Sequence, residues 1–251
     1  MIRRRERPRC TWRFRFIAVH VLLAVWLLRL RIRVRGVEHV PRRGGAVLVF
    51  NHTGHFDLIL TMVPVYRQLG RSCRFLAIRE LWDSRGFALL AWLADAIPVE
   101  RARPGAPAVP GVPGRRPASV AVEALRDGDL VMVAPEGRIS LSFELLELRT
   151  GAVRMAQQAG VPVVPSVSWG TQRVSTTGHA FRWREAVGLP VEIRFGPPLE
   201  VGPHDDVEVA TRQLESQMRR MLDEAQHDYP DGAPRGAWWV PARLGGGAPP
   251  P

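Results

Sequence analysis

Short apolar runs bounded by turn residues recur along this chain, and helical periodicities lie between several of them. Runs of about four to eight apolar residues are typical of buried strands, whereas apolar positions three or four residues apart indicate amphipathic helices. On this basis we expect strands at residues 29–35, 47–50, 74–78, 96–99, 130–134, 161–168 and 191–195. We expect helices at 58–67, 86–94, 119–126 and 150–158, and a last helix with an apolar face from Val207 to Ala225.

This alternation of strands and helices predicts an α/β fold with a mostly parallel central sheet flanked by helices. Ser119 is the expected N-cap of its helix, and Gly128 lies just past the end of that helix. Residues 103–117 and 230–251 are rich in Pro and Gly, so we expect both segments to be irregular. In the second segment, Trp238 and Trp239 either anchor at a membrane interface or pack back on the body.

The N-terminus combines a basic segment, residues 1–15, with an apolar one, residues 16–28. A helix over 16–28 would be about 20 Å long, too short for a hydrocarbon core of about 30 Å. Arginines follow at once, without a small-residue cleavage site, which disfavours a cleaved signal peptide. We therefore expect a membrane-associating helix lying in one leaflet; a membrane span, a signal peptide and a helix packed on the body remain alternatives.

Residues 29–35 alternate arginine with Leu, Ile and Val, which predicts a half-buried strand. We expect its arginine face in solvent or towards a membrane. The chain thus divides into a membrane-associating segment (1–28), an α/β domain (29–229) and a Pro/Gly-rich tail (230–251).

The distribution of charge narrows the possible partners. The chain has 251 residues and a net charge of +11, and all its basic residues are Arg. Residues 1–35 hold eleven Arg and one Glu, a charge of +10, which leaves +1 for the rest. A nucleic-acid-binding body would carry a broad basic face, so we expect no nucleic-acid partner. The basic start instead favours an anionic membrane lipid surface.

The segment Asn51–Asp57, reading NHTGHFD, follows a predicted strand and carries the first candidate chemistry. Across a strand-to-helix turn, His52 and Asp57 can form a hydrogen bond that orients the imidazole as a general base. The alternatives are a capping Asp beside an incidental His, or a metal site with His55. The body has no matching Cys elsewhere, so we expect no metal.

A second candidate, Glu136-Gly137-Arg138, directly follows the strand at 130–134, and Arg101 follows the strand at 96–99. Parallel sheets bind ligands beyond the carboxyl ends of their strands, so we expect these side chains to point into the space above the sheet. Guanidinium groups suit phosphate. Neither a Gly-x-Ser-x-Gly motif nor a phosphate-binding glycine loop is present.

Four segments in this order, NHTGHFD (51–57), IPVER (97–101), APEGRIS (134–140) and VPVVP (161–165), resemble the motifs of the glycerolipid (lysophospholipid) acyltransferase family. The resemblance covers about residues 34–200. The chain departs from the family pattern at Ala96, where Gly is usual, at Ala134, where Phe is usual, and at Arg138, which directly follows Gly137.

The resemblance implies an enzyme that moves an acyl group to the hydroxyl of 1-acylglycerol-3-phosphate, giving phosphatidic acid. The co-substrate would be acyl-CoA or acyl carrier protein, without a cofactor. His52 would be the general base and Asp57 its orienting partner, while Arg101, Glu136, Gly137 and Arg138 would bind the acceptor phosphate. The segment 161–165 would line the acyl side, and backbone N–H groups after Asn51 would help to hold the oxyanion.

Two other functions remain open at this point: acylation of a different lysolipid, and a non-catalytic membrane-binding role. The expected location is the cytoplasmic face of the cell membrane, as a peripheral or monotopic protein.

Overall fold

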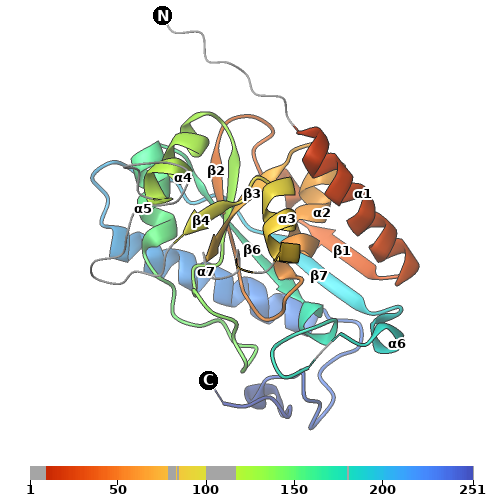
Figure 1. Ribbon diagram of the computed structural model, residues 1–251. Coiled ribbons are helices and arrows are strands. Elements are labelled where there is room, and N and C mark those ends of the chain that lie inside the picture. The colour runs from red at the N-terminus through yellow and green to blue at the C-terminus, as the bar shows by residue number, and fades with distance from the viewer. Residues whose placement is uncertain (1–9, 79–82, 84, 100–116, 180, 251) are drawn as a thin grey trace, which may run out of the picture.

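The computed structural model describes residues 10–78, 83, 85–99, 117–179 and 181–250, and a twisted sheet forms its centre (Figure 1). The strands are β1 (Arg31–Arg35), β2 (Ala46–Phe50), β3 (Cys73–Ile78), β4 (Ile97–Val99), β5 (Leu130–Val133), β6 (Val163–Trp169) and β7 (Pro190–Phe195). Their spatial order is β1-β7-β6-β2-β5-β3-β4. Neighbours are parallel except for β6 and β7, which confirms the mostly parallel sheet.

Helices cover both faces of this sheet, as Figure 1 shows. They are α1 (Trp12–Leu27), α2 (Asp57–Leu69), α3 (Arg85–Leu93), α4 (Pro117–Arg126), α5 (Gly151–Ala159), α6 (Trp183–Ala186) and α7 (Val207–His227). Alternate residues of the central strands belong to two separate hydrophobic cores, one on each face of the sheet. Val47 and Val49 of β2 pack on the side of α4, α5 and α7, whereas Ala46, Leu48 and Phe50 pack on the side of α1 and α2. A strand buried on both faces explains the unbroken apolar run at 46–50.

The main elements lie where the sequence predicts them, within a few residues at each end. Two boundaries differ. Helix α4 begins at Pro117, so Ser119 lies inside the helix. The prediction that Ser119 is the N-cap of this helix is therefore wrong. Proline suits a first helical position because the N–H it lacks has no partner there. Helix α1 begins earlier than the apolar run, because the Thr11 hydroxyl caps it by accepting from the Phe14 N–H.

The arginine face of β1 points away from α1, towards α7 and the tail. Arg31 pairs with Asp231 at 3.7 Å, Arg33 with Glu192 at 3.6 Å, and Arg35 with Asp228 at 2.9 Å. All three arginine side chains are nevertheless exposed, so the expectation that this face turns to solvent is confirmed, and the acids pair with it at the protein surface. The register of β1 beside β7 places Arg33 opposite Glu192, while Asp228 and Asp231 follow the end of α7.

Both ends of the described chain pack on the body. Phe14 and Ala18 of α1 are buried in the core that α2 also forms. In the tail, Trp239 and Val240 are buried in the opposite core, so this part of the tail packs back on the body. In the part of the chain that the structure describes, no helix has the length and apolar character needed to cross a membrane.

Candidate active site

Three neighbouring strands place the candidate residues at one edge of the sheet. Strand β2 lies between β6 and β5 and is parallel to both, so the carboxyl ends of all three strands meet. The first motif follows β2 and the turn with Glu136 follows β5. This is the edge at which parallel sheets bind their ligands.

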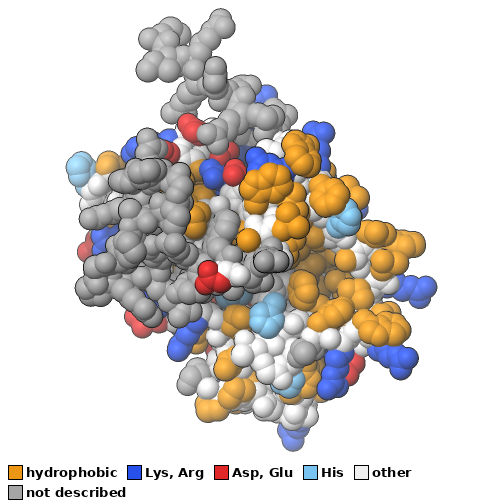
Figure 2. Space-filling view, viewed as in Figure 1, with side chains coloured by type: hydrophobic (Ala, Val, Ile, Leu, Met, Phe, Trp, Pro, Cys, Tyr) orange, Lys and Arg blue, Asp and Glu red, His pale blue; other side chains and the backbone are white. Residues whose placement is uncertain are grey.

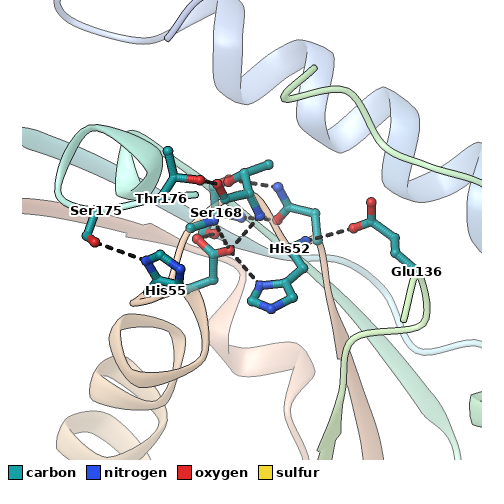
Figure 3. A network of polar contacts seen from close by, with 10 residues as sticks. His52, His55, Glu136, Ser168, Ser175 and Thr176 are labelled. Carbon is teal, nitrogen blue, oxygen red and sulfur yellow. Dashed lines mark hydrogen bonds and ion pairs between the residues drawn. The ribbon is translucent and has the colours of Figure 1, made fainter. Parts of the chain in front are cut away.

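His52 and Asp57 form the predicted hydrogen bond: Nδ1 of the imidazole lies 3.1 Å from Oδ2 of the carboxylate (Figure 3). The same Oδ2 accepts the backbone N–H groups of Thr53 at 2.6 Å and Gly54 at 2.7 Å. Asp57 is fully buried as the first residue of α2, where the helix dipole favours a negative charge. A carboxylate only accepts, so Nδ1 carries the proton and the Nε2 lone pair of the partly exposed imidazole is available as a base.

Asn51 joins the end of β2 to β6. Its side-chain amide donates to the Ser168 carbonyl at 3.0 Å, and its oxygen accepts the Ser168 N–H at 2.7 Å. The Ser168 hydroxyl in turn lies 3.4 Å from the second oxygen of Asp57. Ser168 supports Asp57, and sequence reasoning missed it. The available signal was a serine within the apolar strand that ends beside Asn51.

Glu136 holds the backbone of His52 in place. Its carboxylate accepts the His52 N–H at 2.7 Å and the Leu146 N–H at 3.0 Å, while the Ser140 N–H donates to the His52 carbonyl at 2.7 Å. Burial raises the pKa of Glu136 to about 7. The expectation that Glu136 points into the space above the sheet is wrong, because its side chain reaches across to the first motif (Figure 3).

Two guanidinium groups lie at the turn after β5. Arg138 is exposed beside Gly137, which has a φ of +70°. The Arg149 guanidinium covers Gly137 so closely that a Cβ built on Gly137 would lie 3.1 Å from the guanidinium. The backbone N–H of Arg149 donates to the Pro135 carbonyl. Sequence reasoning missed Arg149, which is eleven residues beyond Arg138. Arg101 lies outside the described residues.

The backbone donors of the first motif are already occupied. The N–H of His52 bonds to Glu136, those of Thr53 and Gly54 bond to Asp57, and that of His55 bonds to the Ser175 carbonyl at 3.0 Å. The expectation that backbone N–H groups hold the oxyanion is therefore wrong for these four residues.

An apolar groove adjoins the turn that carries His55. Its walls come from α1, α2, β3 and α3, and His55 and Tyr66 are the polar side chains among its lining residues. The segment 161–165, expected on the acyl side, does not line it. Val163 and Val164 are instead completely buried in the sheet at the start of β6. In the same described ranges, no group of three or more His, Cys, Asp or Glu side chains could hold a metal ion.

Comparisons with known proteins identify the family. Residues 31–169 match the family model described as Acyltransferase. The human protein named 1-acyl-sn-glycerol-3-phosphate acyltransferase alpha is 33% identical over 229 residues, covering 88% of this chain and 76% of that protein. The Bacillus subtilis protein named 1-acyl-sn-glycerol-3-phosphate acyltransferase is 26% identical over 157 residues, covering 62% of this chain and 71% of that protein.

The fold matches a solved structure as well. The crystal structure of the 1-acyl-sn-glycerophosphate (LPA) acyltransferase PlsC from Thermotoga maritima superposes with a TM-score of 0.65 at 22% identity, covering 86% of this chain and 80% of that one. The family model, the relatives and the fold lead to one conclusion: this chain belongs to the acyltransferase family, of the 1-acyl-sn-glycerol-3-phosphate acyltransferase type, and is an O-acyltransferase.

Proposed function

We propose that this protein moves a fatty acyl group from a thioester, acyl-CoA or acyl carrier protein, to the free hydroxyl of 1-acylglycerol-3-phosphate, giving phosphatidic acid. The observation that carries the proposal is the His52–Asp57 pair, with 3.1 Å between Nδ1 and Oδ2, at the ligand-binding edge of the sheet. The names of the relatives support the choice of acceptor.

In this reaction His52 is the general base. Its Nε2 takes the proton of the acceptor hydroxyl while the oxygen attacks the thioester carbon, and the thiol leaves with that proton. Asp57 orients the ring and stabilises the imidazolium that forms. A general base of this kind contributes about 10²- to 10⁴-fold in rate. Glu136 acts on the backbone, by keeping His52 at the end of β2.

The acceptor phosphate and the acyl chain would bind in two different regions near His52. Arg138 and Arg149 supply positive charge for the acceptor phosphate, with Arg101 as a further candidate from the sequence. The apolar groove beside His55 suits an acyl chain, because its lining is almost wholly hydrocarbon.

We further propose that the face formed by α1 and α3 rests on an anionic membrane surface. Hydrophobic side chains gather on this face (Figure 2). Those that are exposed are Trp12, Phe16, Val19, Leu23, Trp26 and Leu27 of α1, and Leu89, Leu90 and Trp92 of α3. The same helices wall the apolar groove, so a lipid substrate could pass from the bilayer into it. The basic residues 1–9, outside the described part, would add attraction to anionic headgroups.

A panel of acceptors tests the proposed function. The purified full chain is incubated with palmitoyl-CoA and one lysolipid at a time, and phosphatidic acid or another diacyl product is measured by mass spectrometry. We expect transfer to 1-acylglycerol-3-phosphate at a rate at least tenfold above that to lysophosphatidylcholine. A preference for a lysolipid without a terminal phosphate would contradict the assignment of the acceptor.

A further inference from the structure

The proposed reaction needs a hydrogen-bond donor that the backbone of the first motif does not supply. Attack on a thioester moves negative charge onto its carbonyl oxygen, and acyl-transfer enzymes hold that oxygen with donors already in place. The N–H groups of residues 52–55 are all bonded within the protein. A side-chain donor near His52 and open to the substrate could take this role.

His55 meets both requirements by its position. It lies three residues from His52 on the same turn, and Figure 3 shows both imidazoles beside that turn, that of His55 next to Ser175 and that of His52 nearer Glu136. The residue is exposed and lines the apolar groove. Its Nε2 atom has no hydrogen-bond partner in the described part of the chain. The imidazole therefore presents a polar atom at the wall of a groove that is otherwise almost apolar.

Ser175 holds the His55 ring in one orientation. The Ser175 carbonyl accepts the backbone N–H of His55, and the Ser175 hydroxyl lies 3.0 Å from Nδ1 of the His55 ring. When that hydroxyl donates to Nδ1, the ring proton must be on Nε2. Nε2–H is then a donor aimed away from Ser175.

The loop that carries Ser175 is hydrogen-bonded to the turn with His52 and His55 and packs closely against it. The Thr176 hydroxyl donates to the Thr53 carbonyl at 2.6 Å. Gly54 touches the loop so closely that a Cβ there would lie 2.8 Å from the Ser175 carbonyl oxygen and 3.2 Å from the α-carbon of Gln172. These contacts fix His55 relative to His52 before substrate binds, as electrostatic stabilisation of a transition state requires.

We propose that Nε2–H of His55 donates a hydrogen bond to the carbonyl oxygen of the acyl thioester and stabilises the negative charge that develops on it. This role rests on the proposed function. The acceptor hydroxyl gives its proton to Nε2 of His52, the new C–O bond forms, and the carbonyl π electrons move to the oxygen held by His55. When the carbonyl re-forms, the C–S bond breaks and the thiolate takes the proton from His52.

Two substitutions at one position test this role. In His55→Gln the amide nitrogen can reach the place of Nε2 and keep a donor there, whereas His55→Leu removes the donor and keeps the groove apolar. We expect His55→Leu to lower kcat by about 10²- to 10³-fold, the usual cost of one lost oxyanion donor. The KM values should change less than about threefold, and His55→Gln should recover at least about tenfold of the lost kcat.

Ser175→Ala tests the tautomer, because the ring is then free to carry its proton on either nitrogen. We expect a smaller fall in kcat, of about tenfold, and the same thermal midpoint of unfolding as wild type within a few degrees. A His55→Leu protein with wild-type kcat, or with a raised KM and unchanged kcat, would overturn the role of His55. Such a result for His55→Leu would leave the proposed function intact as long as wild type is active and His52→Ala is inactive. A wild-type protein that releases no thiol would overturn both.

Discussion

Replacing Asp57 by Asn removes the charge beside His52 and keeps the shape of the side chain. The amide oxygen can still accept from His52, Thr53 and Gly54, with the amide nitrogen turned to the Ser168 hydroxyl, which can accept. The imidazole therefore keeps its tautomer and orientation. What the variant loses is the attraction between the carboxylate and the imidazolium that forms during the reaction.

That attraction is about 4 kcal/mol for unit charges about 4 Å apart at an effective dielectric constant of about 20. Two backbone N–H groups already share the Asp57 charge, so we take a lower range, about 3–4 kcal/mol. Since about 1.4 kcal/mol is tenfold in rate, Asp57→Asn should lower kcat by about 10²- to 10³-fold. The KM for the acceptor should change by less than about threefold, because Asp57 is fully buried and does not touch substrate.

The assay is thiol release from palmitoyl-CoA at saturating 1-acylglycerol-3-phosphate, with unfolding midpoints as a control for stability. A double variant gives the sharper comparison. If Asp57 acts through His52, then Asp57→Asn should cost almost nothing further in a His52→Ala protein. Wild-type kcat in Asp57→Asn, or another hundredfold loss in the double variant, would refute this reasoning.

Burial raises the pKa of Glu136 from 4.5 to about 7, so the folded protein keeps a proton there that the unfolded chain has lost. The free energy of unfolding should therefore fall, by roughly 3 kcal/mol at most, between about pH 5 and pH 8, and Glu136→Gln should remove this fall in denaturant titrations. Arg138→Gln and Arg149→Gln should each raise the KM for 1-acylglycerol-3-phosphate about tenfold in steady-state kinetics, and an unchanged KM in both would exclude them from the phosphate site. Trp26→Glu should weaken binding to anionic vesicles at least about tenfold in sedimentation, whereas Val209→Glu, on α7 at the opposite face, should leave it unchanged.

The parts of the site that could be predicted from the sequence are the local ones. His52 and Asp57 are five residues apart across a strand-to-helix turn, and that spacing alone brings them together. Likewise, an apolar run such as 46–50 predicts a strand wherever it lies in the sheet.

The parts that could not be predicted depend on the order of the strands. Glu136 reaches the backbone of His52 because β5 is next to β2, and Ser168 reaches Asp57 because β6 is next to β2 on the other side. Period-two alternation predicted that β1 has an arginine face, but not that this face pairs with an acid of β7 and with two acids that follow α7. Strand order and register are long-range properties that a local pattern does not contain.

The central claim is that His52 is the base of an acyl transfer, and thiol release in His52→Ala tests it most directly. The rate is measured with palmitoyl-CoA and 1-acylglycerol-3-phosphate for wild type, His52→Ala and the control His204→Ala, whose side chain is exposed on the loop before α7. We predict acceptor-dependent thiol release in wild type and in His204→Ala, and a loss of about 10²- to 10⁴-fold in His52→Ala with folding intact. Thiol release at the wild-type rate in folded His52→Ala would contradict the account.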